Sequence, residues 1–417
     1  MKMLEISKEK FEDFAKNYPY YNYYQTENYA LVMKESGFDY NFIAYTDNDE
    51  KILAAGMFLT KKITRNYYYS YCPKGFIIDY NDSDLVRRFT NNLKKYYKRK
   101  NVILLKINPE ISIATINSKN NFERKTNSNI DILEDLKKYG FKKRKETKPL
   151  QLIEPKLYGT INLKDYDITK LDKNIQYKIE KSENNGLEIE LSDESKIDII
   201  YNLIKYNDKK DINFYKNMLI NFKKYNQADL LLVKVNYESY LINAKKKVEE
   251  EQIRNDELNE SLKNDMSSDI LSEKMESDRI LEEYKKDVVY ATQGLRKNEE
   301  TYIAGALVIK FENKISIIAL SKDENYNYLN QEYFLYNEII NMYKDEYEIL
   351  DINAIADDFK EDSIYTEYNR LKLEFNPTIN ESIGEFDLVI SEWKFKVVEK
   401  NNILSNEFSK KKDIDTK

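Results

Sequence analysis

Histidine is absent from the 417 residues of this sequence, and with it the commonest general base and metal ligand of proteins. Ser-His and Cys-His catalytic pairs and histidine-based zinc sites are therefore excluded. The one cysteine, Cys72, cannot form a disulfide within the chain, and such cysteine usage is typical of a reducing cytoplasm. We expect a cytoplasmic protein whose chemistry relies on Lys, Arg, Asp, Glu, Tyr or the substrate itself, with no metal ion.

Long apolar runs, tryptophan, proline and glycine are also scarce. No apolar stretch of about 18 residues is present, and the first residues lack the apolar core of a signal peptide. The composition is nevertheless that of a folded protein, because 41% of the residues are hydrophobic, with 36 Tyr and 18 Phe in the chain. A chain of this length predicts about two or three domains, each large enough to bury a core.

A highly charged stretch at residues 244–298, which we call the arm, interrupts the sequence around it. It contains no proline and one glycine, Gly294. On either side of a polar run, apolar residues recur at intervals of three to six positions, which predicts a narrow apolar stripe on a helix; they are Val248, Ile253, Leu258 and Leu262, then Ile270, Leu271, Met275, Leu281 and Tyr284. Because the polar run at 264–269 favours a turn, the arm predicts two antiparallel helices of roughly 20–25 residues each. The alternative is a solvated charged linker.

The arm carries most of the net charge of the chain. Residues 244–287 contain 9 Lys and Arg against 14 Asp and Glu, whereas the whole chain has a net charge of −6. The rest of the chain is therefore close to neutral. Because the net charge of the arm is negative, the arm is not expected to hold a polyphosphate through bulk electrostatics.

Strand-forming residues flank the arm on both sides. Residues 228–244 precede it and residues 302–321 follow it, with turn residues at Asn236 and at Asn313-Lys314. This pattern places the arm in the connection between two strands of one sheet.

A similar passage at 41–72 has no insertion. It contains LAAG at 53–56, where the passage after the arm contains IAGA at 303–306. The likeness predicts an internal repeat, in which the chain consists of two versions of one α/β unit and the second carries the arm.

Helical and strand patterns alternate along the rest of the chain, which predicts the α/β class with mixed sheets. Helices are expected at about 8–17, 26–36, 83–99, 130–139, 171–185, 194–207, 213–224, 329–343 and 363–371, and further strands at 102–107, 157–163, 187–192, 348–354 and in a last hairpin at 386–400. The predicted domains are a first unit at 1–155, a second unit at 156–243 and 301–405, the arm at 244–300 and a polar tail at 406–417.

Six short passages resemble, in their order, the Fem family of aminoacyltransferases (FemABX and MurM-type). They are YYQTENYALVMKESG at 23–37, YCPKGFIIDY at 71–80, LLKINPEI at 104–111, ADLLLVKV at 228–235, YIAGALVIKF at 302–311 and IGEFDLVI at 383–390. The resemblance runs from about residue 11 to residue 400. It implies two GNAT-like units with mixed sheets and a helical hairpin, an antiparallel coiled coil, inserted in the second.

The resemblance also implies a function, namely transfer of an amino acid from aminoacyl-tRNA to the peptide stem of a peptidoglycan precursor. The implied partners are aminoacyl-tRNA, a lipid- or nucleotide-linked muropeptide, the membrane surface that carries a lipid-linked substrate, and a second copy or related transferase in a dimer. Aminoacyl-tRNA serves as co-substrate, so no cofactor is expected. The alternative function is that of a diverged, catalytically weak relative that acts as a binding or partner subunit.

The chemistry of such a transfer needs no histidine. An aminoacyl ester is already activated, so the acceptor amine must only lose a proton and reach the carbonyl carbon. Holding the reactants together can supply about 7–11 kcal/mol of the barrier reduction, and a cation or donor beside the developing oxyanion supplies more. Because a lysine amine has an ordinary pKa of about 10.4, a carboxylate or a desolvated site must help to deprotonate it.

Matching motifs imply four site residues in the first unit. Lys34 corresponds to a family lysine that meets the phosphates of the precursor, and its alternative is a solvated lysine on a helix. Tyr71, Lys74 and Asp79 lie in the loop that resembles the substrate-contacting loop. The alternative for this loop is an ordinary turn followed by an aspartate at the start of a helix.

Four more site residues are implied in the second unit. Lys372 corresponds to a family lysine that is a candidate for stabilising the oxyanion or the tRNA end; its alternative is an exposed residue at a helix end. Phe375, three residues further on, is implied as a substrate-contacting residue, and its alternative is a residue of the hydrophobic core. Lys209 and Lys210 stand where the family has an arginine-containing loop.

The sequence also departs from the family pattern. Asn108 stands in place of a carboxylate, and Phe76 in place of a proline. Glycine-rich passages of the family are replaced by INAIADDFKED at 352–362 and by Asn376-Pro377. Lost glycines usually mean a lost close approach of the backbone to a ligand. These changes put catalysis in question more than the fold.

Overall fold

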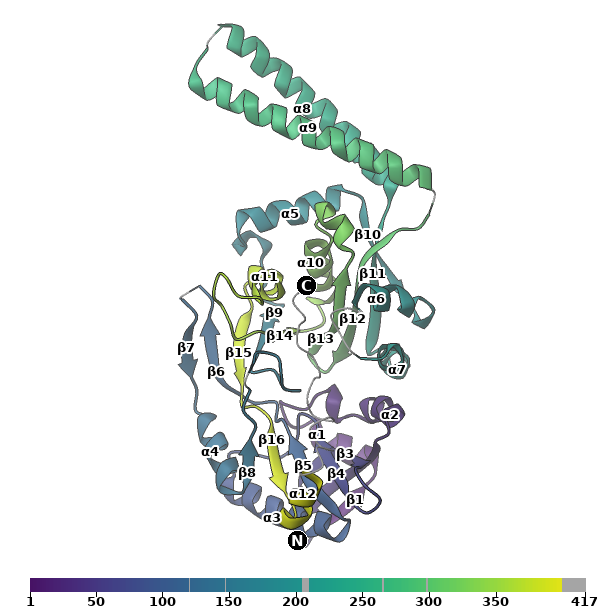
Figure 1. Cartoon of the computed structure of the whole chain (residues 1–417), viewed down its shortest axis with the longest axis vertical. Helices are drawn as coiled ribbons and strands as arrows, with labels where there is room; N and C mark the ends of the chain where they lie inside the picture. The colour runs from purple at the N-terminus through teal and green to yellow at the C-terminus, as the bar shows by residue number, and fades with distance from the viewer. Residues whose placement is uncertain (120, 147, 205–209, 265, 298, 400–417) are drawn as a thin grey trace.

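The structure is a computed structural model that describes residues 1–119, 121–146, 148–204, 210–264, 266–297 and 299–399 (Figure 1). Helices cover two mixed β-sheets, which confirms the predicted α/β class. The helices are α1 (Lys8–Ala15), α2 (Glu27–Glu35), α3 (Ser83–Arg99), α4 (Ile130–Lys138), α5 (Lys173–Asn184), α6 (Ile197–Ile204), α7 (Ile212–Lys223), α8 (Tyr237–Asn264), α9 (Ser268–Lys297), α10 (Gln331–Tyr343), α11 (Thr366–Glu374) and α12 (Glu392–Glu399).

Among the described residues, the strands of each sheet lie side by side in the following order. The first contains β1 (Lys2–Ile6), β2 (Asp39–Thr46), β3 (Ile52–Lys62), β4 (Tyr68–Cys72), β5 (Val102–Ile107), β16 (Phe386–Val389) and β8 (Phe141–Lys143). The second contains β10 (Leu187–Ser192), β11 (Ala228–Val235), β12 (Tyr302–Phe311), β13 (Lys314–Lys322), β14 (Ile349–Ile355), β9 (Leu157–Asn162), β15 (Thr378–Ser382), β6 (Ser112–Asn117) and β7 (Glu123–Thr126).

The strand order of the two sheets agrees with the predicted internal repeat. In both sheets four antiparallel neighbours are followed by one parallel pair, β4 with β5 and β13 with β14, and then by an antiparallel strand. The small residues occupy matching places, because Gly56 lies opposite Ile43 and Gly305 lies opposite Leu232. The arm connects β11 to β12, where the first unit has only a short turn between β2 and β3.

The two units exchange strands, so the sheets do not divide at residue 155. Strands β6 and β7 leave the first unit and extend the second sheet, whereas β16 returns to the first sheet and pairs with β5. Helices α1, α2, α6 and α7 lie between the sheets and share one apolar core, to which Phe11 and Phe222 both belong. The two units are therefore packed together through one core.

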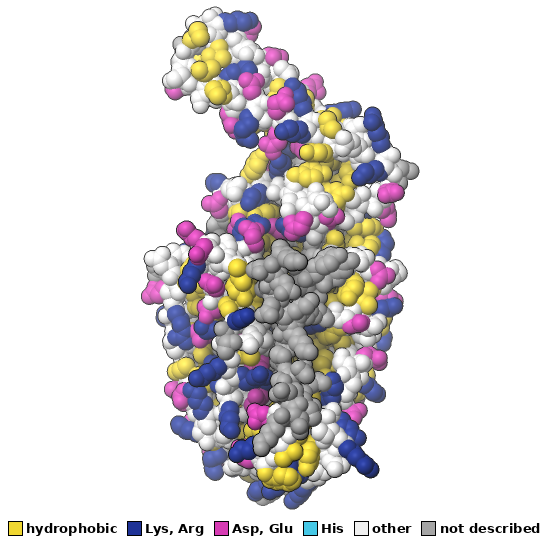
Figure 2. Space-filling model, viewed as in Figure 1, with side chains coloured by type: hydrophobic (Ala, Val, Ile, Leu, Met, Phe, Trp, Pro, Cys, Tyr) yellow, Lys and Arg dark blue, Asp and Glu magenta, His cyan; other side chains and the backbone are white. Residues whose placement is uncertain are grey.

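The arm lies in α8 and α9, helices of 28 and 30 residues that run side by side away from the body (Figure 1), and α8 begins at Tyr237, before the predicted start of the arm. Positive and negative side chains are interspersed along it (Figure 2). The predicted apolar stripe is only partly right. Leu281 is buried between the helices, but Ile253, Leu271 and Met275 are exposed, and the buried Asn255 donates a hydrogen bond to Ser277 Oγ instead (3.1 Å).

The base of the arm belongs to the core of the second unit. Residues 237–244, whose strand-forming composition predicted a continuation of the sheet, are helical, because Tyr240 and Ala244 lie one turn apart and both pack into that core. The Tyr240 hydroxyl donates to Asp287 Oδ1 (2.6 Å). A side chain at Gly294 would collide with the Tyr237 ring, so glycine permits this close packing.

The described part of the predicted strand hairpin, residues 386–399, does not form a hairpin. The first part is β16, and α12 follows it after a short bend, with Val398 packed into the core shared by the units. Within the described residues, no helix has both the length and the apolar character needed to cross a membrane.

Candidate active site between the two sheets

Charged side chains meet where β4 and β5 of the first unit end beside the start of β13 in the second. Lys74 Nζ lies 2.7 Å from Glu154 Oε2 and 2.9 Å from Glu110 Oε2. Glu110 Oε1 in turn lies 2.9 Å from Lys314 Nζ. We call these four residues the ion-pair chain. It joins the two units through groups that are largely withdrawn from water, since the side chain of Lys74 is 16% exposed and that of Glu154 is 3% exposed.

Burial and charge act against one another along the ion-pair chain. Burial favours the neutral form of Glu110, but the ammonium groups of Lys314 and Lys74 prevail and hold its pKa well below the usual range. Glu154 is more deeply buried and faces one ammonium group, so burial prevails and raises its pKa. The pKa of Lys74 is raised, because its two carboxylates outweigh its burial. The ion-pair chain thus combines one firmly ionised carboxylate, Glu110, with one that retains its proton more readily, Glu154.

Asn108 explains how the site accommodates the loss of a carboxylate from the family pattern. Its side-chain Nδ2 donates to Glu154 Oε2 (2.8 Å), and its Oδ1 accepts from the backbone N–H of Lys74 (3.0 Å). A carboxylate at this position could make neither the first hydrogen bond nor a favourable contact with Glu154. Glu154 therefore supplies a carboxylate close to the position where the family pattern places its own.

Asp351 and Lys372 lie on the second-unit side of the ion-pair chain. Burial raises the pKa of Asp351, a half-buried residue of β14, and the charges of Lys314 and Glu110 also reach it. Lys372, in the last turn of α11, donates to the backbone carbonyl of Ala354 on the same strand. Burial lowers the pKa of Lys372 to about 7, although the charge of Asp351 opposes this shift. A carboxylate with a raised pKa therefore lies near an amine with a lowered one.

Tyrosine side chains surround the first-unit end of the site. The Lys74 ammonium lies 5.9 Å from the centre of the Tyr24 ring. Tyr71 and Tyr29 are buried in the core between the sheets. Burial raises the pKa of the Tyr71 hydroxyl well above its ordinary value, and the neighbouring Tyr29 and Glu154 add to this shift. A cavity of about 30 Å³ opens on Glu110 and Lys314 from the side of the Tyr20–Tyr23 segment.

The structure thus brings together three of the residues that the resemblance implied, namely Tyr71, Lys74 and Lys372. The alternative interpretation of Lys372, an exposed residue at a helix end, is wrong, because the side chain is half-buried and donates to the backbone carbonyl of Ala354. The sequence did not lead to five other residues of this site. They are Glu110, Glu154, Lys314, Asp351 and Asn108, the last of which was noted only as a departure from the family pattern. Of these, Glu110 and Asn108 lie within the quoted passage LLKINPEI, whereas the other three carry no motif signal.

The remaining implied residues lie elsewhere. Lys34 is exposed in the last turn of α2, and Asp79 is exposed in the loop before α3, where it accepts from the backbone N–H of Asn81 (2.9 Å). Lys210 is exposed and its ammonium lies 4.4 Å from the Phe214 ring centre. Lys209 lies outside the described residues.

Phe375 takes its alternative role as part of the core. It is 1% exposed, and its ring lies 5.1 Å from that of Tyr336 in a stacked arrangement. It therefore supports α11, and with it Lys372, rather than presenting a surface to a ligand. Among the described residues, no group of three or more Cys, Asp or Glu side chains is arranged to hold a metal ion.

The fold and this site define a class of protein with two fused mixed α/β units, a long inserted pair of helices and a charged junction between the units. The model of the FemAB family matches residues 6–401, and the chain belongs to that family. The solved crystal structure of FemX has the same fold, with a TM-score of 0.72 at 18% identity over 96% of this chain and 100% of that one.

Two relatives come from Staphylococcus epidermidis. An aminoacyltransferase FemA is 25% identical over 256 residues, which are 58% of this chain and 60% of that protein. A lipid II:glycine glycyltransferase is 21% identical over 413 residues, which are 96% of this chain and 95% of that protein. The chain thus aligns with only 60% of the length of the FemA relative but with nearly all of the glycyltransferase.

Proposed function

We propose that this protein is an aminoacyltransferase that moves an amino acid from aminoacyl-tRNA to an amine on the stem peptide of a peptidoglycan precursor. Membership of the FemAB family and the names of the two relatives support the reaction class. The observation that carries the proposal is the placement of Asp351 and Lys372 beside the ion-pair chain, at the junction of the two units.

The reaction needs a base for the acceptor amine and a donor for the developing oxyanion, and Asp351 and Lys372 suit these two roles. The acceptor nitrogen forms a C–N bond to the ester carbonyl, the C–O bond to the tRNA ribose breaks, and the amine gives up a proton that the leaving ribose oxygen finally takes up. A carboxylate whose pKa is raised by burial accepts that proton more readily than an ordinary one, which favours Asp351 as the base. Lys372 would donate a hydrogen bond to the developing oxyanion, and its partly desolvated position supports this role.

The ion-pair chain would hold these groups in place. Lys74 and Glu110 come from the first unit, and Lys314 comes from the second. The ion-pair chain would therefore fix the width of the junction in which the two substrates must meet. Lys34, exposed on the first unit, is available to a phosphate of the precursor. The protein would work in the cytoplasm with charged tRNA and a lipid- or nucleotide-linked muropeptide, alone or as a dimer.

A transfer assay tests the proposal. Purified protein is incubated with charged tRNA and a lysine-containing precursor, and the precursor is followed by mass spectrometry. The expected result is a mass increase of one amino-acid residue that requires the aminoacyl ester, so uncharged tRNA serves as the control. Binding of both substrates without any transfer would contradict the proposal and favour a binding or partner subunit.

A further inference from the structure

Trp393, the one tryptophan of the chain, lies on the outside of the molecule. Its side chain is 64% exposed, and that of Val397, one turn further along α12, is 51% exposed. Residues four apart lie on the same face of a helix. On the other side of α12, Phe395 and Val398 pack against the core shared by the two units. The helix therefore presents an apolar face that the body does not cover.

Three segments of the first unit meet α12 beside this face. Lys394 Nζ donates to Asn101 Oδ1 (3.1 Å), in the turn after α3, and lies 5.3 Å from the centre of the Tyr67 ring, in the turn between β3 and β4. Lys142 Nζ of β8 lies 3.7 Å from a Glu392 oxygen. At this end of the molecule, opposite the arm, Figure 2 shows hydrophobic side chains with Lys and Arg side chains around them.

The end surface, which we define as α12, residues 62–67, residues 98–101 and Lys142, has an excess of positive charge. Its eight cations are Lys62, Arg65, Lys98, Arg99, Lys100, Lys142, Lys394 and Lys396. Three carboxylates oppose them, namely Glu392 and Glu399 of α12 and Glu5, so the excess is five. Asp39, at the start of the neighbouring strand β2, would lower it only to four. Lys98, Arg99 and Lys396 are exposed and have no ion-pair partner among the described residues.

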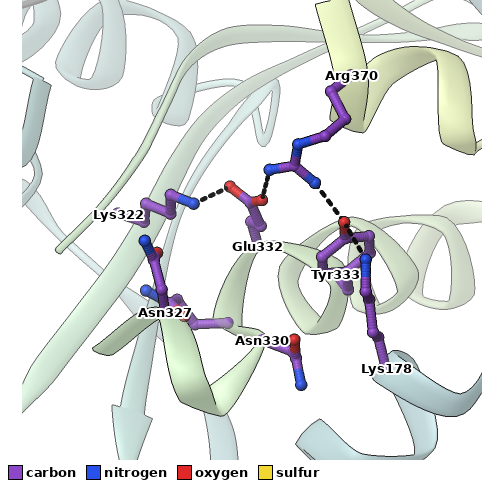
Figure 3. A pocket seen from close by; sticks show the side chains of 8 residues that line it. Lys178, Lys322, Asn327, Asn330, Glu332, Tyr333 and Arg370 are labelled. Carbon is purple, nitrogen blue, oxygen red and sulfur yellow. Dashed lines mark hydrogen bonds and ion pairs between the residues drawn. The ribbon is translucent and has the colours of Figure 1, made fainter. Parts of the chain in front are cut away.

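The cavity at the start of α10, of about 180 Å³, shows the opposite situation (Figure 3). Its three cations are Lys178, Lys322 and Arg370. Four carboxylates pair with the last two of them, and these are Glu324, Glu332, Glu367 and Glu374. The charges of this cavity are therefore satisfied within the protein, unlike those of the end surface.

The charge of the end surface argues against an occupant supplied by the chain itself. Residues 400–417, which follow α12, contain five Lys against one Glu and two Asp, so they are positive as well. Two copies of the end surface would repel each other. A duplex nucleic acid offers phosphates to the cations but no apolar surface to Trp393 and Val397. An anionic bilayer supplies both, because its headgroups attract cations and its interface accommodates tryptophan.

We propose that the end surface docks on an anionic phospholipid bilayer. The proposal rests on the proposed function, because a lipid-linked precursor would lie in such a membrane. Trp393 and Val397 enter the interfacial region of the bilayer, and Lys98, Arg99 and Lys396 remain among the lipid phosphates.

The end surface and the ion-pair chain lie at opposite ends of the same two strands. β4 begins after Tyr67 and ends before Lys74, and β5 begins after Asn101 and ends before Glu110. Strands of five and six residues are about 16–20 Å long, so docking would hold the site up to about 20 Å above the headgroups. An extended stem peptide gains about 3.3 Å per residue beyond its membrane-bound sugar diphosphate and can cover that distance. Docking thus favours the lipid-linked precursor over the nucleotide-linked one.

Vesicle binding by the full-length protein tests the proposal. The probes are vesicles of phosphatidylcholine alone and of an equal mixture of phosphatidylcholine and phosphatidylglycerol, and flotation measures the bound fraction. Because Trp393 is the one tryptophan, its fluorescence reports its own surroundings. The variants are Trp393→Ala, Lys98→Gln and Lys396→Gln. The matched controls lie in the second unit; they are Ile364→Ala, at a side chain that is 62% exposed, and Lys173→Gln, at an exposed lysine.

We expect wild type to bind the anionic vesicles and not the neutral ones, with a shift of the Trp393 emission to shorter wavelength. Trp393→Ala should bind about tenfold more weakly, and each lysine variant about fivefold more weakly. Binding should also weaken as salt is added. The controls should bind like wild type, and thermal unfolding verifies that every variant is folded. Transfer to a nucleotide-linked precursor in solution should be unchanged in the three variants, whereas transfer to a vesicle-bound lipid-linked precursor should fall with vesicle binding.

Equal binding to neutral and anionic vesicles, an unshifted Trp393 emission or equal losses in the controls would overturn the proposal. Two further measurements address the other occupants. Loss of RNA-hairpin binding without loss of vesicle binding in Lys98→Gln and Lys396→Gln would assign the surface to a nucleic acid instead. Self-association that light scattering detects in wild type but not in Trp393→Ala would assign it to a second copy.

Vesicle binding requires neither charged tRNA nor precursor, so its outcome is separate from that of the transfer assay. Vesicle binding that depends on Trp393, without any transfer, would keep the end surface and contradict the proposed function. Transfer by a protein that does not bind anionic vesicles would remove the end surface alone.

Discussion

Lys74 Nζ lies 2.7 Å from Glu154 Oε2, and this contact joins the loop after β4 to the segment before β9 across 80 residues of sequence. The side chain of Lys74 also contacts Glu110, so its one positive charge faces two carboxylates. The residue is therefore a structural support as well as a candidate site residue. A variant of Lys74 can therefore lose activity through loss of stability as well as through loss of a site residue.

Removal of the Lys74 charge should destabilise the protein. In Lys74→Met, the nearly inaccessible Glu154 loses its cation, and breaking a buried pair from one side typically costs about 3–5 kcal/mol. Urea unfolding should show this loss, while the exposed control Lys173→Met should stay within about 0.5 kcal/mol of wild type. Unchanged stability in Lys74→Met would show that Lys74 does not support the junction.

Asp351→Asn should remove most of the transfer activity with little effect on binding. A general base typically contributes about 10²–10⁴-fold in rate, and asparagine cannot accept the proton. Because burial raises the pKa of Asp351, the wild-type rate should fall with decreasing pH while the pH is still above the ordinary aspartate value. The variant should lack this acid limb in a single-turnover pH profile. A profile that keeps its acid limb would assign the base to another group.

Lys372→Met should slow the transfer step more than it weakens binding. Loss of one donor to an oxyanion usually lowers the rate by about two to three decades. Single-turnover assays with saturating precursor and charged tRNA measure the step directly, and circular dichroism verifies that the variant is folded. A decrease of less than about tenfold would exclude a role for Lys372 in transition-state stabilisation.

Lys372 should also make stability depend on pH. Its folded-state pKa is lowered to about 7 from the ordinary lysine value of 10.5, so between these values the unfolded chain binds more protons than the native one. Stability should therefore rise as the pH increases from about 7 toward 10. In Lys372→Met this contribution is absent, and the difference in unfolding free energy between the two proteins should change across that range. A constant difference would contradict the lowered pKa.

The outer part of the arm should be dispensable for folding. Replacement of residues 246–286 by a short Gly/Ser loop retains Tyr240, Asp287 and their hydrogen bond, and a doubling of loop length costs only about 0.6 kcal/mol. The shortened protein should stay soluble and unfold cooperatively. Deletion of residues 237–297 should not be tolerated, because it also removes Tyr240 and Ala291 from the core. Aggregation of the shorter replacement would show that the arm stabilises the body.

Local patterns in the sequence determined much of the fold. Alternating and helical apolar spacing predicted the central strands and most helices, and the matching passages LAAG and IAGA predicted the repeat that Gly56 and Gly305 now mark. The motif YCPKGFIIDY led to Lys74, and the passage around Lys372 led to the other side of the site. Such features are visible because they depend on neighbours within a few residues.

Tertiary structure alone decided which distant groups meet. The sequence gives no sign that β16 returns to the first sheet, that β6 and β7 extend the second, or that Tyr240 continues a helix rather than a strand. Glu154 acquires its partner Lys74 across 80 residues of sequence, and Lys314 acquires its partner Glu110 across 204 residues, so both pairs form only when distant segments are packed together. The pKa values of Asp351 and Lys372 depend on burial, which is a property of the packed chain and has no local signature in the sequence.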